Sequence, residues 1–232
     1  MKFIIGNWKM NGTRRDKEKM INALSKIRTK NKIILALPFT LLWGNNKNIA
    51  IAAQNISEHD NGAYTGDISG KMLTDAGVKY VIVGHSERRT YHNETDEIIH
   101  DKAITAIKNK ISPIICIGET LNEYKSGKTN GTIKKMLKQV LPTTGKFMIA
   151  YEPRWAIGTG KTPTMKEIES VHKTIFEYLA SQGFDKTPII YGGSVNSTNA
   201  SEIAKIKHVD GLLVGGASLE SKNFITIIKS VK

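Results

Sequence analysis

Short apolar runs recur along the whole chain and are the strongest signal in its sequence. Each run is rich in Ile, Val, Leu or Ala and is apolar throughout, without alternating polar residues. Strands of this kind are typical of parallel sheets that are covered on both faces. The pattern predicts eight buried strands, at residues 3–5, 33–37, 49–53, 80–83, 113–117, 147–151, 188–191 and 211–214.

The segments between these runs have the spacing of helices. Apolar residues fall on one face at Met20, Ile21, Leu24 and Ile27, at Ile168, Val171, Ile175 and Leu179, and less strictly at Ile98, Ala103, Ile104 and Ile107. Before the second of these faces, Thr164 and Glu167 have the spacing of a capping box, and Gly183 fits a C-cap. The links 38–48 and 54–66 predict less regular helices.

Eight strand–helix units share 232 residues, so each has about the length of a minimal βαβ repeat. No linker rich in Pro, Gly or Ser separates them, and we expect one α/β domain over residues 1–232. Alternating strands and helices form either an open doubly wound sheet or a closed barrel. The count of eight favours a single (β/α)₈ barrel.

Charge and composition narrow the function only a little. The chain has 34 Lys and Arg against 21 Asp and Glu, a formal net charge of +13, which suits nucleic acid, anionic lipid or a small anionic substrate. The basic residues are spread over most of the predicted helices, with no stripe interleaved with aromatic residues. We therefore expect no nucleic-acid partner.

Membrane and disulfide signals are weak. No apolar run approaches the length of a membrane span, and the first apolar run is too short for a signal peptide. The one cysteine, Cys116, excludes an intrachain disulfide and reads as a small buried hydrophobic residue. We expect a cytoplasmic protein with no membrane partner.

Polar residues follow the predicted strands where a barrel would have its active site, at the carboxyl ends. They are Asn7 and Lys9 after the first strand, the segment 84–89 with His85, Ser86 and Glu87 after the fourth, Glu152 after the sixth, and glycine pairs after the last two. Any one of them can be a helix cap or a structural residue. Together they place a carboxylate, an imidazole and a cation at one mouth.

The last two strand ends resemble a phosphate site. Gly192, Gly193 and Ser194 follow the seventh strand, and Gly215 and Gly216 follow the eighth. In barrels of this class the loops after strands seven and eight commonly bind phosphate through backbone N–H groups. With Lys9 nearby, the ligand is expected to be a small phosphate ester.

Residues 151–160, YEPRWAIGTG, combine a buried carboxylate with a stiff loop. Glu152 at the end of a buried strand loses hydration, which disfavours its charged form unless other groups compensate. Pro153 stiffens the exit, Trp155 and Ile157 are large and apolar, and the segment 158–160 frees the backbone again. The pattern predicts a stiff segment between two hinges.

Several stretches, in order along the whole chain, resemble the triosephosphate isomerase family. They are NWKMNG (7–12), AAQNIS (52–57), GAYTGDIS (62–69), VGHSERR (83–89), CIGET (116–120), AYEPRWAIGTGKTPT (150–164), YGGSV (191–195) and GLLVGGASL (211–219). The resemblance implies a (β/α)₈ barrel that interconverts dihydroxyacetone phosphate and D-glyceraldehyde 3-phosphate in glycolysis and gluconeogenesis. It also implies that no metal and no organic cofactor take part.

The resemblance assigns a role to each residue at the mouth. Glu152 would be the base, His85 the neutral electrophile, Lys9 the cation that stabilises the enediolate, and Asn7 a substrate-orienting residue. Glu87 and Ser86 would support them from behind. The phosphate would be bound by backbone N–H groups of Gly158, Ser194, Gly215 and Gly216, under a lid made of Pro153, Arg154, Trp155, Ala156, Ile157, Thr159 and Gly160.

The resemblance also implies a homodimer, because the loop 62–67 resembles one through which Thr65 reaches the active site of a neighbouring subunit. Two positions depart from the family. Arg154 stands where Val is common, and Tyr124 stands where Arg is usual, so a salt bridge there is expected to be missing. Another barrel enzyme acting on a sugar phosphate, and a non-catalytic phosphate-binding protein, remain as alternatives.

Overall fold

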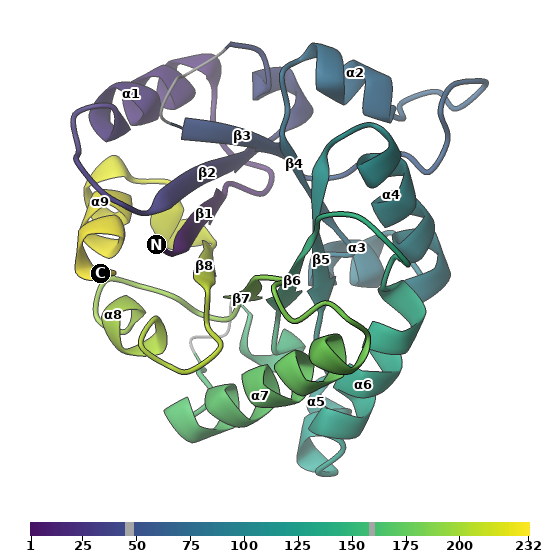
Figure 1. Ribbon diagram of the computed structural model, residues 1–232. Helices are drawn as coiled ribbons and strands as arrows, with labels where there is room; N and C mark the ends of the chain where they lie inside the picture. The colour runs from purple at the N-terminus through teal and green to yellow at the C-terminus, as the bar shows by residue number, and fades with distance from the viewer. Residues whose placement is uncertain (45–48, 158–160) are drawn as a thin grey trace.

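The backbone closes a parallel sheet into a barrel surrounded by helices (Figure 1). In this computed structural model, residues 1–44, 49–157 and 161–232 are described. Neighbouring strands follow the order of the chain, and β8 pairs with β1 to close the sheet. The strands are β1 (Phe3–Asn7), β2 (Lys32–Leu37), β3 (Ile49–Ala53), β4 (Tyr80–Val83), β5 (Ser112–Ile117), β6 (Met148–Tyr151), β7 (Ile189–Tyr191) and β8 (Gly211–Val214).

All eight predicted strands are present, with ends that differ by no more than two residues. The closed barrel, which the count of eight favoured over an open sheet, is confirmed. Every strand is buried on both faces, which explains why the runs are apolar throughout. Inside the barrel lie small and medium side chains such as Ala36, Ala52 and Ala150, whereas larger ones pack between the strands and the helices.

Helices follow the strands and cover the outside of the barrel (Figure 1). Capping boxes at Thr13, Thr120 and Thr164 fix the starts of three of them, and the predicted box at Thr164 is confirmed. Gly183 lies one residue beyond the cap, Gln182, with a positive φ of 81°. The helices are α1 (Arg14–Leu24), α2 (Gly70–Asp75), α3 (Ser86–Tyr91), α4 (Asp96–Lys108), α5 (Leu121–Lys125), α6 (Thr129–Val140), α7 (Met165–Ser181), α8 (Ala200–Ile203) and α9 (Ser221–Ser230).

Three details of the helix prediction were wrong. Helix α1 ends at Leu24, so Ile27 packs against the core from the following loop. Helix α4 buries Ile99, Ala103 and Ala106, whereas Ile104 is 39% exposed, because the helical spacing puts it on the outer face. The segment 54–66 has no helix; α2 begins later, at Gly70, where the Ser69 side chain accepts the N-terminal hydrogen bond from Met72 N–H.

The link 38–48 has a single 3₁₀ turn at Phe39–Leu41, and residues 45–48 lie outside the described part of the chain. In the described residues, no helix has the length and hydrophobicity required to cross a membrane. The strands all run in the same direction, so their carboxyl ends gather at one end of the barrel and their amino ends at the other. The two ends have different chemistry.

Candidate active site

Glu152 lies directly after β6 and is buried at the carboxyl end of the barrel, with 1% of its surface exposed. Its Oε2 accepts a hydrogen bond from the backbone N–H of Ser86 at 2.9 Å. Its Oε1 has no hydrogen-bond partner among the described residues, although His85 Nε2 lies 3.3 Å away. One oxygen of this carboxylate is therefore held in place while the other is left for a ligand.

His85 is fixed by the start of α3. It caps the helix, and its Nδ1 accepts a hydrogen bond from the Glu87 backbone N–H at 3.2 Å. A ring nitrogen that accepts a hydrogen bond carries no proton, so the other nitrogen, Nε2, is the donor of a neutral imidazole. The ring therefore presents an N–H group on the same side as Glu152.

Lys9 supplies the positive charge of the site. Its Nζ lies 2.7 Å from Glu87 Oε1, and its backbone has a φ of 51°, a left-handed conformation that is costly for a residue with a side chain. Asn7 Oδ1 accepts the Lys9 backbone N–H at 3.0 Å, and Gln54 Nε2 donates to the Lys9 carbonyl at 2.9 Å. Strained conformations of this kind persist where surrounding contacts hold them, often at functional sites.

Two glycines make room for Glu152. A Cβ added at Gly118 would lie 1.6 Å from the Glu152 carbonyl oxygen, and one added at Gly192 would lie 2.9 Å from Glu152 Cγ. Both distances are shorter than real contacts, so any larger residue would displace the backbone or the side chain of Glu152. The sequence analysis assigned no role to Gly118, and it placed Gly192 in the expected phosphate site rather than beside Glu152.

The loops after β7 and β8 lie against the same mouth. Within the described part of the chain, the backbone N–H groups of Ser194, Gly215 and Gly216 donate no hydrogen bond to another residue. The Ser194 hydroxyl instead donates to the Ala156 carbonyl at 2.8 Å. Three backbone donors are thus left for an anion, as a phosphate site requires. Gly158, the fourth predicted donor, lies outside the described residues.

The segment after Glu152 is anchored by several side chains as far as Ile157. A 3₁₀ turn spans Arg154–Ala156. The Trp155 indole donates to Glu119 Oε1 at 2.7 Å, and the Arg154 backbone N–H donates to the Glu119 carbonyl at 3.2 Å. Thr159 and Gly160, the other predicted lid residues, lie outside the described part of the chain.

Glu119 holds the segment after Glu152, and the sequence analysis did not single it out. It is fully buried after β5, and burial raises the pKa of its carboxyl, which hydrogen bonds from Trp155 and Tyr151 oppose. Its Oε2 has no partner among the described residues. The signal was available, because Glu119 is a carboxylate at the end of a buried strand, as Glu152 is.

The two departures from the family take part in local contacts. The Tyr124 ring stacks on Trp155 at 4.1 Å, and its hydroxyl donates to Glu167 Oε1 at 2.8 Å. The Arg154 guanidinium donates to Thr90 Oγ1 at 3.1 Å. Tyr124 therefore contacts the loop by stacking and hydrogen bonding, where an arginine would offer charge.

Cys116 is buried in β5 on the inside of the barrel, as expected. Burial raises the pKa of its thiol well above the ordinary value, and the charge of Glu152 acts in the same direction. Thr65 is exposed on the loop between β3 and α2. Among the described residues, no group of His, Cys, Asp and Glu side chains is arranged to hold a metal ion.

The mouth of the barrel contains a small cleft of about 190 Å³. Glu152, His85, Lys9 and Asn7 line it together with the glycine loops after β7 and β8, namely Gly192, Gly193, Ser194, Gly215 and Gly216. A carboxylate, a neutral imidazole, a cation and unused backbone donors therefore face one space. This arrangement defines a (β/α)₈-barrel enzyme in which a carboxylate and an imidazole lie beside unused backbone donors.

Comparison with known proteins identifies the family. The family model described as Triosephosphate isomerase matches residues 2–231, and the chain belongs to the triosephosphate isomerase family. Its relatives include the triosephosphate isomerase of Mycoplasma mobile, 47% identical over 98% of this chain and 99% of that protein. That of Mycoplasmopsis pulmonis is 45% identical, over 97% and 96% respectively.

Solved structures agree with the sequence comparison. The crystal structure of triosephosphate isomerase from Bartonella henselae superposes with a TM-score of 0.90 and 37% identity, covering 99% of this chain and 98% of that one. The similarity therefore extends over the whole barrel. Members of this family are intramolecular aldose–ketose isomerases, and the chain is an isomerase of that family.

Proposed function

We propose that the chain interconverts dihydroxyacetone phosphate and D-glyceraldehyde 3-phosphate at the cleft between Glu152, His85 and Lys9. One observation carries the proposal. The buried Oε1 of Glu152 has no hydrogen-bond partner among the described residues, and His85 Nε2 lies 3.3 Å from it. Proton transfer next to a carbonyl requires a base at the carbon and a hydrogen-bond donor at the oxygen. A phosphate-binding protein without catalysis would have no use for this pair.

Glu152 is the base. Its Oε1 takes a proton from the carbon next to the carbonyl and returns it to the neighbouring carbon, while Ser86 N–H holds the other oxygen. His85 donates from Nε2 to the carbonyl oxygen and moves the proton between the two substrate oxygens. The glutamate base with a neutral histidine is a pattern already established for this family. Lys9 stabilises the negative charge of the enediolate intermediate, and Asn7 holds the Lys9 backbone.

The backbone N–H groups of Ser194, Gly215 and Gly216 bind the substrate phosphate, as their unused donors suggest. The segment from Pro153 onward serves as a lid that excludes water, since an enediolate phosphate exposed to solvent can expel its phosphate. The reaction uses no metal and no organic cofactor. We place the protein in the cytoplasm, consistent with its single cysteine.

The protein acts as a homodimer. The loop between β3 and α2 extends beyond the helices of its own barrel (Figure 1), and residues 61–67 on it are exposed. Met10, beside Lys9, is 95% exposed and Tyr64 is 46% exposed. Apolar residues exposed next to an active site are typical of surfaces that contact another subunit. In this arrangement Thr65 reaches the partner's cleft.

A coupled assay with glyceraldehyde 3-phosphate tests the function, and Glu152→Asp tests the base. Aspartate keeps the charge but withdraws the carboxylate, and a misplacement of about 1 Å can cost on the order of 10² in rate. We expect kcat to fall by about that factor with KM nearly unchanged. Glu97→Asp, on the exposed face of α4, is the matched control and should keep wild-type kinetics.

Two results would contradict the proposal in different ways. If the wild-type protein bound the substrate without turning it over, the chain would be a phosphate-binding protein and not an isomerase. If Glu152→Asp turned over substrate as fast as the wild type, the activity would stand but Glu152 would not be the base.

A further inference from the structure

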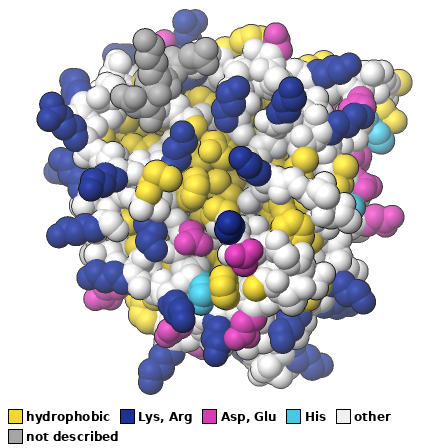
Figure 2. Space-filling view, in the orientation of Figure 1, with side chains coloured by type: hydrophobic (Ala, Val, Ile, Leu, Met, Phe, Trp, Pro, Cys, Tyr) yellow, Lys and Arg dark blue, Asp and Glu magenta, His cyan; other side chains and the backbone are white. Residues whose placement is uncertain are grey.

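A second pocket lies at the opposite end of the barrel from the cleft. It has a volume of about 980 Å³, against about 190 Å³ for the cleft. Phe3, Tyr80, Ser112 and Met148 line it and are the first residues of β1, β4, β5 and β6. The pocket therefore opens at the amino ends of the strands, and Figure 2 shows this face of the molecule.

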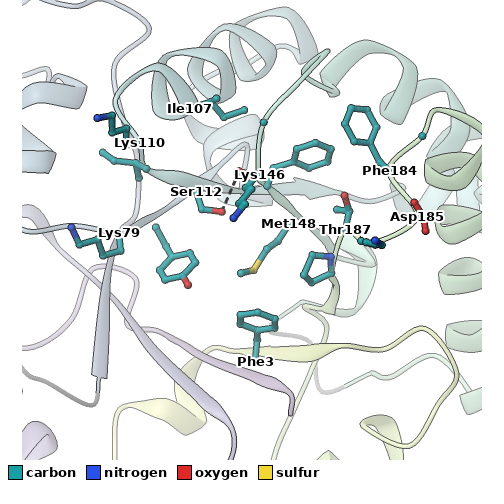
Figure 3. Close-up of a pocket in the computed structure, with 17 residues that line it drawn as sticks. Phe3, Lys79, Ile107, Lys110, Ser112, Lys146, Met148, Phe184, Asp185 and Thr187 are labelled. Carbon is teal, nitrogen blue, oxygen red and sulfur yellow. Dashed lines mark hydrogen bonds between the residues drawn. The ribbon is translucent and has the colours of Figure 1, made fainter.

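The wall of this amino-end pocket is largely apolar. Besides the strand residues, it includes side chains from the loops before β6 and β7, where Phe147 and Phe184 pack edge to face at 5.0 Å. Figure 3 shows Phe3, Met148 and Phe184 around one open space. Binding sites for organic molecules commonly have several hundred Å³ of mostly apolar wall with a few polar groups.

The rim of the pocket is cationic. Lys79, Lys110, Lys146 and Lys186 line it, with Asp185 as the one acidic residue among the described lining residues. All four lysines are exposed, and none of them forms an ion pair with a described residue. Figure 3 places Lys79 and Lys110 on one side and Lys146 near the middle, above the apolar wall.

We infer that the amino-end pocket binds an amphipathic organic anion, with its apolar body on the Phe3–Met148 wall and its anionic group among the four lysines. An apolar molecule without charge would leave the ammonium groups unused, and an inorganic anion would leave the apolar wall exposed. Burial of the body and attraction to the rim act together only for a ligand that has both parts. The proposal is independent of the catalytic roles assigned above.

The test uses two fluorescent probes that share their rings and differ in charge. They are 1-anilinonaphthalene-8-sulfonate, which is anionic, and N-phenyl-1-naphthylamine, which is neutral. We expect one saturable site per chain for the anionic probe, with weaker binding of the neutral one. Inorganic phosphate, which competes at the cleft, should not displace the probe.

Two variants separate the contributions of charge and wall. Lys146→Glu with Lys186→Glu should weaken binding of the anionic probe by at least about tenfold and change that of the neutral probe by less than about twofold. Ser112→Phe, which extends a ring from the first residue of β5 into the pocket, should weaken both. Lys30→Glu, in the loop before β2 at the same end of the barrel, is the matched control and should leave both affinities unchanged.

Isomerase activity of each variant reports that the barrel is folded, since none of these residues lies at the cleft. The role of the rim would be refuted if the wild type bound both probes with equal affinity and if Lys146→Glu with Lys186→Glu changed neither affinity. Displacement of the probe by phosphate would place it at the cleft, and binding that survives both the charge variant and Ser112→Phe would place it elsewhere on the surface. Either result would refute the inference.

Discussion

The position of the Glu152 carboxylate depends on residues that have no side chain. Gly118 allows the backbone of Glu152 to approach the end of β5, and Gly192 leaves space for its Cγ. Ser86 N–H then fixes one carboxylate oxygen at 2.9 Å. Because catalysis depends on distances of this precision, residues that contact no substrate can still set the rate.

Replacement of Gly192 by alanine tests this dependence. The added Cβ would lie 2.9 Å from Glu152 Cγ, so the carboxylate has to move, and we expect kcat to fall by about tenfold with a smaller change in KM. Gly131→Ala in α6 is the matched control, because its Cβ would meet nothing within 4 Å. Steady-state kinetics of both purified variants give the answer, and equal kcat values for the two would show that Gly192 does not position the base.

The loop after β6 is held as an element through contacts with three neighbouring segments. Trp155 and the backbone of Arg154 bond to Glu119 after β5, the Ser194 hydroxyl bonds to the Ala156 carbonyl, and the Arg154 guanidinium bonds to Thr90 in α3. Motion of this loop must break or exchange some of these bonds. The rate of such motions limits turnover in many enzymes with lids.

Arg154→Val tests how much its charge contributes. The guanidinium is partly exposed, and its charge also acts on Glu123, one of several causes that lower the pKa of that carboxyl, the first of them a backbone hydrogen bond from Thr120. A partly exposed hydrogen bond is worth about 1 kcal/mol and the apolar stem can be replaced, so kcat should stay within about threefold of wild type. Arg154→Met, which keeps the stem without the charge, is the control. A fall of kcat well beyond this range in both variants would show that the charge is required for full activity.

The strands, and the residues that meet at the cleft, could be predicted from the sequence because each had a local signal. Runs apolar on both faces marked the strands, and polar residues directly after them marked the mouth. Contacts between distant segments had no such signal. Three such contacts depend on which loops meet in space. They are the stacking of Tyr124 on Trp155, the hydrogen bond from Gln54 to the Lys9 carbonyl, and the close approach of Gly118 to the Glu152 backbone. Ile104 lies on the outer face of α4, so a weak helical pattern does not determine which face of a helix is buried.

The proposed dimer can be tested through Thr65. This residue is exposed on the loop between β3 and α2, and arginine there adds bulk and positive charge to a chain that already carries +13. We expect Thr65→Arg to weaken association by at least about tenfold, with a parallel loss of activity.

Sedimentation at assay concentration, together with kinetics, measures both effects of Thr65→Arg. Thr226→Arg, on the exposed face of α9, makes the same chemical change away from that loop and should leave association intact. Full activity in a wild-type protein that sediments as a monomer would contradict the dimer and the role of Thr65 together.

The stability of the barrel should depend on pH through a buried histidine on the outside of the sheet. His172 in α7 is fully buried against Tyr151 and Tyr191, and its Nδ1 bonds to the His208 carbonyl at 2.9 Å. Burial, aided by the nearby charges of His208 and Lys2 and opposed by that hydrogen bond, lowers the pKa of His172 from 6.5 to about 4. The native chain therefore stays neutral at this site where the unfolded chain takes up a proton.

His172 makes its full contribution to the unfolding free energy above pH 6.5 and loses it as the pH falls toward 4. A difference from 6.5 to about 4 corresponds to roughly 3 kcal/mol at 1.36 kcal/mol per unit of pKa. Glu119 acts in the opposite direction. Because its pKa is raised, the native state binds a proton at a higher pH than the unfolded state does, so the burial of Glu119 costs stability as the pH rises and less as it falls.

Denaturant unfolding of His172→Gln between pH 7 and 4 measures the contribution of the histidine. The variant should be less stable at pH 7, where it loses the packed ring, and should lose less of its remaining stability on acidification than the wild type. His92→Gln, at an exposed turn after α3, is the matched control for removal of a histidine. Equal losses of unfolding free energy in His172→Gln and the wild type would show that His172 is not the group whose protonation weakens the barrel in acid.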